Sequence, residues 1–110
     1  MAEIQIHFDE KGLAPVVVQD VNDRQVLMVA WMNREAFERT IQTGRLHFWS
    51  RSRKEIWLKG TTSGNYLFLK ELFIDSDEDT VLGLVAPAGP ACHTGERSCF
   101  YRQIYPEKKI

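Results

Sequence analysis

The hydrophobic positions near the start of the chain fall into two short runs rich in valine. Residues 16–18 and 26–29 form these runs, and the turn-prone residues 22–24 separate them. β-Branched side chains favour strands, whereas Asn and Asp favour turns. The pattern therefore predicts a β-hairpin over residues 15–32.

From Asn33 onward the spacing of the apolar residues changes to that of a helix. Asn33 is a good N-cap residue, and Phe37 and Ile41 lie about one turn apart on the same helix face. Gly44 suits the end of the helix because glycine adopts the left-handed conformation easily. The sequence predicts one main helix over residues 33–43.

Five more short apolar runs follow the predicted helix, and turn-forming residues separate them. They cover residues 46–50, 56–59, 66–74, 81–85 and 100–105. Because only one helix is available as a crossover, we expect most strands to pair antiparallel. The 110 residues suit one hydrophobic core. The predicted fold class is α+β, a β-dominated single domain over residues 1–110 with largely antiparallel strands.

Charge and composition narrow the possible partners and the compartment. The formal net charge of -1 gives no general attraction to nucleic acid or to an anionic membrane. The acidic start of the chain does not resemble a secretory signal, and no apolar run approaches the ~18 residues that span a bilayer. We expect a cytoplasmic protein that forms a homodimer, since small domains often leave apolar surface exposed.

The densest chemical signal is the segment that holds both cysteines and one histidine. Cys92 and Cys99 lie at the two ends of a glycine-containing loop, and His93 follows the first cysteine. Thiolate and imidazole groups are ligands that zinc prefers. Two ordinary buried cysteines, or a disulfide that closes the loop, explain the spacing about equally well. In a reducing compartment, free thiols or metal ligands are favoured over a disulfide.

A second cluster places three aspartates at alternating positions after an apolar run. Asp75, Asp77 and Asp79 share one face if the strand continues through them. Their mutual repulsion would be relieved by a hard cation such as Mg²⁺. A solvated acidic turn between two strands is the alternative, and on these residues alone it is the better explanation.

Basic and aromatic residues alternate between the helix and the next glycine-rich loop. Arg51, Arg53 and Lys59 could bind phosphate oxygens, and the rings of Trp49 and Trp57 could stack on bases. An amphipathic hairpin with aromatic residues in the core is the alternative, and we prefer it for both tryptophans. The acidic cluster and the net charge argue against a single-stranded nucleic-acid binder.

The loop 60–65 offers hydroxyl groups from Thr62 and Ser63 and two glycines. Such a loop can contact a phosphate or a metal-bound water, and it can equally be a plain hairpin turn. His7 and His47 lie in strand-like segments, where a histidine is more often structural than catalytic.

Taken together, these segments resemble the phosphoribosyl-AMP cyclohydrolase family over nearly the whole chain. No single motif decides the resemblance, and the order and spacing of the motifs carry it. The matching segments are residues 26–33, 47–53, 57–60, 62–65, 75–79, 89–95 and 98–102.

The resemblance implies a homodimer with active sites at the subunit interface. It implies Mg²⁺ bound by Asp75, Asp77 and Asp79, and zinc bound by three cysteines, of which two match Cys92 and Cys99. The third cysteine belongs at Ser76, and a serine hydroxyl is a much poorer zinc ligand than a thiolate. Thr61 is a second departure, because an acidic residue is more usual there.

Three explanations of Ser76 remain open. The first is an introduced Cys-to-Ser change that keeps the shape and removes the metal ligand. The second is a natural variant in which His93 or water completes the zinc site, and the third is a non-catalytic relative that only binds nucleotides. We favour the first, since serine is the nearest isostere of cysteine.

The resemblance also implies a reaction, the hydrolytic opening of the adenine N1–C6 bond of 1-(5-phosphoribosyl)-AMP in histidine biosynthesis. Zinc would lower the pKa of the attacking water, and His93 is the candidate proton carrier. Mg²⁺ would bridge phosphate oxygens, with Arg51, Arg53 and Lys59 as further phosphate contacts and the hydroxyls of Thr62 and Ser63 nearby.

Overall fold

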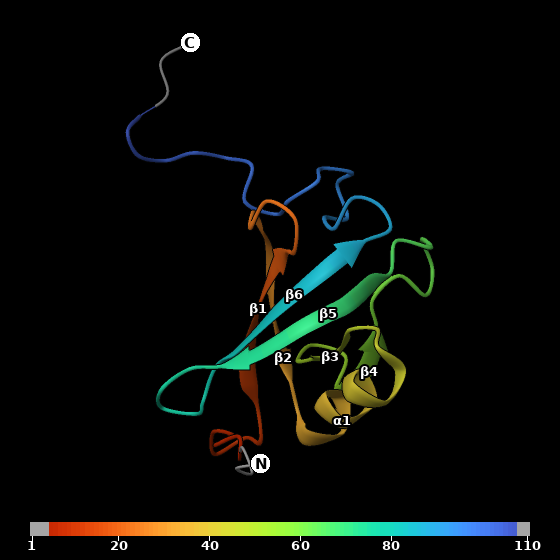
Figure 1. Cartoon of the computed structure of the whole chain (residues 1–110), viewed down its shortest axis with the longest axis vertical. Coiled ribbons are helices and arrows are strands. Elements are labelled where there is room, and N and C mark those ends of the chain that lie inside the picture. Colours follow the sequence, from red (N-terminus) through yellow and green to blue (C-terminus); the bar gives the residue numbers. More distant parts are fainter. Residues whose placement is uncertain (1–4, 108–110) are drawn as a thin grey trace.

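The computed structural model describes residues 5–107, which form six strands and one helix (Figure 1). The elements are β1 (Ala14–Asp20), β2 (Val26–Met32), α1 (Arg34–Thr43), β3 (His47–Ser50), β4 (Glu55–Leu58), β5 (Leu67–Ile74) and β6 (Val81–Pro87). The predicted α+β fold class, dominated by strands with one main helix, is confirmed.

Four of the strands form one sheet in the order β2-β1-β6-β5, and β3 and β4 form a separate hairpin. The β1–β2, β5–β6 and β3–β4 pairs are antiparallel, as expected. The central pair, β1 with β6, is parallel, which the sequence did not predict. A parallel pair needs a long connection between its two strands. Here all the intervening elements, from β2 to β5, form that connection, and no single crossover helix does.

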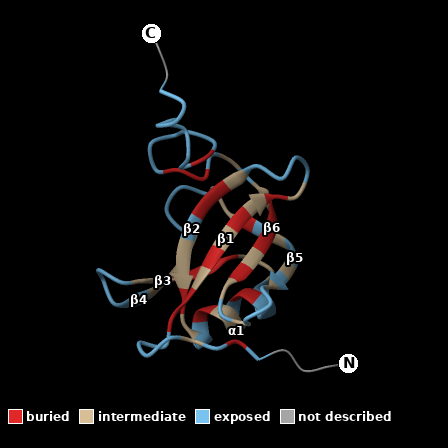
Figure 2. Cartoon of the chain, turned by 90° about the vertical axis from the view of Figure 1, so that its left-hand side faces the viewer, coloured by how far each residue is buried: buried red, intermediate tan, exposed pale blue. Residues whose placement is uncertain are grey.

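The hydrophobic core lies on one face of this sheet, which α1 and β3 cover. Val16 and Val18 of β1 are completely buried there, together with Ala36 of α1 and with Leu46 and Phe48 at β3. Figure 2 shows the sheet strands beside one another, with α1 and the β3–β4 hairpin at their lower end. The opposite sheet face contributes no residue of β1 to this core.

Both ends of α1 are fixed by the residues that the sequence pointed to. The Asn33 side chain accepts a hydrogen bond from the N–H of Ala36 at 2.8 Å. Gly44 has φ +72, and its N–H donates to the carbonyl oxygen of Thr40 at 2.9 Å. Within the described chain, α1 lacks the length and apolarity that a membrane-spanning helix needs.

The expected strand over residues 100–105 does not form, and this prediction was wrong. Phe100, Tyr101, Ile104 and Tyr105 are exposed, and the segment extends away from the sheet. Its composition favours a strand, yet within residues 5–107 it has no neighbouring strand to pair with. A strand is stable only when a partner accepts its main-chain hydrogen bonds.

Gly60 permits the sharp turn between β4 and β5. It has φ +98, and a Cβ atom there would lie 2.6 Å from the main-chain nitrogen of Tyr66. A side chain would therefore meet both an unfavourable φ and a collision with rigid backbone. At Gly44, by contrast, φ is also positive but a Cβ would have no atom within 4 Å.

Replacing Gly44 and Gly60 by alanine should separate the cost of a positive φ from the cost of the collision with backbone. We expect Gly44→Ala to lower the free energy of unfolding by about 1 kcal/mol, the usual cost of an alanine at positive φ. Gly60→Ala should lower it by about 3 kcal/mol because overpacking adds to that cost. Urea unfolding of both variants measures the difference, and equal losses would contradict the collision.

Candidate active site

One hollow brings together five of the residues that the sequence pointed to. It has a volume of about 300 Å³ and lies between the end of β4, the loop 60–65 and the loop after β6. We call it the thiol pocket, and its lining includes Lys59, Thr62, Ser63, Cys92 and His93. An ammonium group, two hydroxyls, a thiol and an imidazole thus line one cavity, although they come from separate segments.

Close contact between the two loops shapes the thiol pocket. The N–H of Ala88 donates to the carbonyl oxygen of Tyr66 at 2.9 Å, which joins the segments at their base. A Cβ atom at Gly89 would collide with the side-chain oxygen of Asn65. Glycine at this position therefore lets the loop after β6 approach the loop 60–65.

The two thiols differ in their surroundings. Cys92 is buried, and the hydroxyl of Thr94 donates to its Sγ at 3.1 Å, which lowers the pKa of the Cys92 thiol. Cys99 is an exposed residue whose sulfur is partly desolvated, and this desolvation together with the adjacent Cys92 raises the pKa of its thiol. Both cysteines are free, so the disulfide alternative is not realised.

Charge pairing anchors the far end of the cysteine loop to the sheet. The Arg97 guanidinium lies 2.7 Å from a carboxylate oxygen of Asp20 and 3.0 Å from one of Asp23. The Ser98 hydroxyl and the Cys99 N–H donate to main-chain carbonyl oxygens of β2, at 2.6 and 2.7 Å. These contacts position Cys99 relative to Cys92.

Arg97 and Asp20 are positioning residues that the sequence pattern did not predict. Asp20 is buried, at 5% exposure, and it ends the otherwise apolar strand β1. A buried carboxylate needs a partner, and Arg97 lies within the cysteine loop. The acidic residue at the end of a valine-rich run was the signal that could have revealed the pair.

The three aspartates lie together in the turn between β5 and β6. Each of Asp75, Asp77 and Asp79 offers an oxygen atom within 4.8 Å of the others, and all three are exposed. Partial desolvation raises the pKa of the Asp75 carboxyl, but hydrogen bonds from the N–H groups of Asp79 and Thr80 outweigh it, so this pKa lies below its usual range. Oxygen atoms so placed suit a hard divalent cation.

The aspartates and the thiol pocket lie at opposite ends of the β5–β6 hairpin (Figure 1). Ile74 pairs with Val81 at the aspartate end, and Leu67 pairs with Pro87 at the thiol end. At ~3.3 Å per strand residue, the two ends are roughly 20 Å apart. Within one chain, Ser76 therefore lies far from Cys92 and cannot share a metal ion with it.

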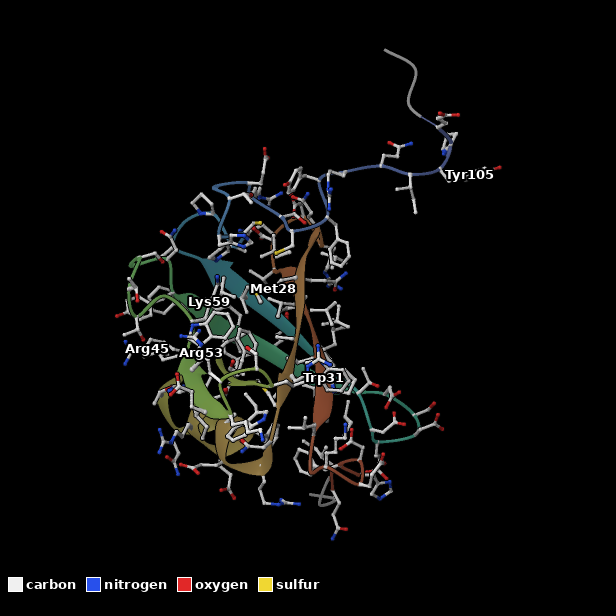
Figure 3. The ribbon with its side chains drawn as sticks, turned by 180° about the vertical axis from the view of Figure 1, so that it is seen from behind. Met28, Trp31, Arg45, Arg53, Lys59 and Tyr105 are labelled. Carbon is white, nitrogen blue, oxygen red and sulfur yellow. The ribbon has the colours of Figure 1, made fainter. Side chains whose placement is uncertain are left out.

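The basic residues are only partly gathered around the thiol pocket. The Lys59 ammonium lies 5.4 Å from the centre of the Trp57 ring and lines the pocket. The Arg51 guanidinium lies over the Trp31 ring, at 4.7 Å, in a neighbouring hollow. Arg53 pairs with a nearby glutamate at 3.8 Å and does not line the pocket. Figure 3 shows Arg53 and Lys59 on one side of β2.

Two tryptophans connect the thiol pocket to the aspartate turn along the surface. Trp57 lines both the thiol pocket and the hollow that contains Arg51. Trp31 lines the Arg51 hollow and also a third hollow, which contains Asp77 and Asp79. Trp57 also packs against the core and against the Phe48 ring, as the amphipathic-hairpin interpretation requires.

The remaining singled-out polar residues have structural contacts. The N–H of His47 donates to the buried Thr40 hydroxyl at 2.9 Å, and a ring nitrogen of His47 lies 2.9 Å from the Arg45 carbonyl oxygen. His7 lines the hollow that contains Asp77 and Asp79. The Thr61 hydroxyl donates to the Leu58 carbonyl oxygen at 2.8 Å and closes the turn.

Comparison with known proteins adds independent information. A sequence profile of the family described as phosphoribosyl-AMP cyclohydrolase matches residues 28–101. This range contains α1, the strands β3 to β6, the aspartate turn and the cysteine loop.

Individual relatives agree with the profile. The phosphoribosyl-AMP cyclohydrolase of Lacticaseibacillus paracasei is 58% identical over 98 residues, which cover 89% of this chain and 88% of the relative. That of Archaeoglobus fulgidus is 52% identical over 101 residues, covering 92% and 94%. A histidine biosynthesis bifunctional protein of Thermosynechococcus vestitus is 54% identical over 99 residues, covering 89% and 46%. The chain belongs to the phosphoribosyl-AMP cyclohydrolase family.

Proposed function

We propose that this chain is a phosphoribosyl-AMP cyclohydrolase that acts in histidine biosynthesis in the cytoplasm. The reaction is hydrolysis of the adenine N1–C6 bond of 1-(5-phosphoribosyl)-AMP. Family membership supports the activity. The observation that carries the proposal is the thiol pocket, where Lys59, Cys92 and His93 line one cavity with two hydroxyl groups.

Cys92 and Cys99 would hold zinc. Their thiols are adjacent, and the hydrogen bond from Thr94 favours the thiolate form of Cys92, which is the form that binds metal. When bound, zinc lowers the pKa of water to about 7, so that a nucleophile is available near neutral pH.

Asp75, Asp77 and Asp79 would hold Mg²⁺. Their oxygen atoms already lie within 4.8 Å of one another, and carboxylates are the ligands that this cation prefers. When bound, Mg²⁺ neutralises phosphate charge on the substrate. The aspartate turn is exposed, so a substrate phosphate can approach it from solvent.

The remaining pocket residues would bind the substrate and move protons. Lys59, Thr62 and Ser63 bind phosphate oxygens, and Arg51 and Arg53 contact the second phosphate outside the pocket. The water oxygen bonds to C6, and His93 takes one water proton and returns it to N1 as the N1–C6 bond breaks. The second water proton moves to the exocyclic nitrogen, so that C6 becomes the carbonyl carbon of a carboxamide. His93 is an exposed residue that lines the pocket.

A complete site would need two copies of the chain. The thiol pocket and the aspartate turn lie at opposite ends of one hairpin, so a homodimer would place the aspartates of one copy beside the cysteines of the other. In that arrangement residue 76 of one copy approaches Cys92 and Cys99 of its partner. Ser76 then takes the place of a third zinc ligand.

Ser76 also supports a second candidate, a nucleotide-binding relative without catalysis. A neutral hydroxyl binds zinc poorly, so two thiolates alone would hold the ion weakly. The pocket and the basic residues would still accept a nucleotide. The two candidates differ in whether restoring a thiol at residue 76 restores zinc and turnover.

Ser76→Cys should therefore raise both zinc content and activity. Because a change in a supporting residue already alters metal affinity by ~10- to 100-fold, a new thiolate ligand should raise zinc affinity by more than about 100-fold. Zinc per chain and a spectrophotometric ring-opening assay measure the two effects. Ser52→Cys, which adds a thiol at another exposed serine, should leave both unchanged. Full zinc binding without turnover in Ser76→Cys would favour the binding protein.

Shared sites can be tested by mixing two inactive variants in the Ser76→Cys background. Asp77→Asn and Cys92→Ser should each abolish ring opening. A mixed dimer would have one site with both defects and one intact site, so random mixing should recover about a quarter of the parental activity. As a control, a chain that carries both changes should show no activity, because every site in its homodimer has both defects. No recovery from the two-variant mixture would exclude sites shared between subunits.

A further inference from the structure

One aromatic side chain, Trp57, forms a wall that two hollows share. It lines the thiol pocket, and it also lines the hollow that contains Arg51, which has a volume of about 480 Å³. Among the described residues that line these two hollows, no other belongs to both. A ligand that occupies both hollows therefore crosses the Trp57 side chain.

The core holds the indole ring of Trp57 in place. In the β3–β4 hairpin Trp57 pairs with Phe48, which is completely buried, and the two ring centres lie 5.4 Å apart with an angle of 57° between the ring planes. Trp57 itself is half-buried, so part of its side chain packs in the core and the rest lines the hollows. A ring positioned in this way loses little conformational entropy when a ligand stacks on it.

The tryptophan rings of this region already attract cations. The ammonium group of Lys59 lies 5.4 Å from the centre of the Trp57 ring, and the Arg51 guanidinium lies 4.7 Å from the centre of the Trp31 ring. The face of an indole ring is electron-rich, and tryptophan binds cations better than the other aromatic residues. Within the described chain, neither hollow is lined by a carboxylate. A cationic ligand would therefore meet aromatic faces here rather than acidic side chains.

The substrate of the proposed function carries a positive charge on its purine. A second ribose phosphate is attached to N1 of the adenine, and this bond uses the lone pair of that nitrogen. The amidine formed by N1, C6 and the exocyclic nitrogen then takes up a proton near neutral pH, which leaves the ring cationic. The adenine of AMP is neutral at the same pH. Charge therefore distinguishes this substrate from ordinary adenine nucleotides.

The two phosphates determine where this purine would lie. In the proposed function Lys59 binds one phosphate in the thiol pocket, and Arg51 contacts the other in the neighbouring hollow. The purine connects the two ribose phosphates, so it lies between these cations, where Trp57 separates the hollows. When Lys59 turns to its phosphate, the face of the Trp57 ring becomes available to the purine.

We propose that Trp57 selects the N1-substituted, cationic purine over a neutral adenine by stacking on its charged ring. This assignment deepens the proposed function and rests on it for the identity of the substrate. One cation replaces another on the indole ring, because the purine takes the place of the Lys59 ammonium group. The cation is the form that binds, and its exocyclic nitrogen releases the extra proton to solvent before the second water proton reaches it.

Three nucleotides separate the effect of charge from that of shape. The first, 1-methyl-AMP, is cationic, whereas 1-methyl-IMP carries the same methyl group on a neutral purine, and AMP is neutral and lacks the methyl group. Isothermal titration calorimetry of the wild type in EDTA should give a dissociation constant for 1-methyl-AMP about tenfold lower than for either neutral nucleotide. If 1-methyl-AMP bound no more tightly than the neutral nucleotides, the proposal would be overturned.

Trp57→Leu removes the ring, and Trp49→Leu is its matched control. Trp49 is also half-buried and lines the Arg51 hollow, but it does not line the thiol pocket. The preference for 1-methyl-AMP over 1-methyl-IMP should fall to about one in Trp57→Leu and stay about tenfold in Trp49→Leu. A general defect of the pocket would weaken both nucleotides equally, so an unchanged ratio in Trp57→Leu, or an equal fall in Trp49→Leu, would contradict the role of Trp57.

A conservative variant keeps the test valid if Trp57→Leu does not fold, which far-UV circular dichroism checks. Trp57→Phe retains an aromatic ring, but this ring binds cations more weakly than indole does. The preference for the cationic nucleotide should therefore fall to about threefold. A preference in Trp57→Phe as large as that of the wild type would argue against the indole ring as its source.

Because these measurements use metal-free protein, they do not depend on ring opening. A charge preference that disappears in Trp57→Leu, together with a zinc-loaded Ser76→Cys protein that opens no ring, would refute the proposed catalysis and leave a nucleotide site selective for cationic purines. Turnover by Ser76→Cys together with an unchanged preference in Trp57→Leu would refute the role of Trp57 and leave the proposed function standing.

Discussion

The ladder of main-chain hydrogen bonds between β5 and β6 sets the distance between the two groups of candidate metal ligands. It is continuous apart from one irregularity, and its two ends carry the aspartate turn and the thiol pocket. Side-chain rotation cannot bridge the length of a paired strand, and a twisted sheet is too stiff to fold back on itself. The separation is thus a property of the backbone, and within one chain it keeps the two candidate sites apart.

Each candidate site is held by contacts that need no metal ion. On the thiol side, Arg97 joins the cysteine loop to Asp20 and Asp23, and Gly89 lets that loop meet Asn65. On the aspartate side, main-chain N–H groups converge on one carboxylate. Ligands positioned in advance lose less conformational entropy when an ion or substrate binds. The fold therefore does part of the work of binding before any ligand arrives.

Local signals in the sequence were sufficient for the local structure. Asn33 and Gly44 bound the helix as expected, because capping depends on a few neighbouring atoms. The motifs that form the thiol pocket were predicted separately, but their assembly was not, since it is the pairing of β5 with β6 that brings the β4–β5 loop and the cysteine loop together. The parallel β1–β6 pair could not be predicted for the same reason. The strand predicted over residues 100–105 does not form, because strand propensity does not reveal whether a partner strand exists.

The parallel pairing of β1 with β6 has a consequence for how the chain folds. Val16 meets Val81, so two neighbours at the centre of the sheet are separated by most of the polypeptide. During synthesis, the first hairpin and α1 can form while the rest of the chain is still being made, but their sheet stays incomplete until β6 emerges from the ribosome. Contacts between such distant segments slow folding and prolong the exposure of apolar strands. The nascent chain should accordingly depend on chaperones until its last strand has been inserted.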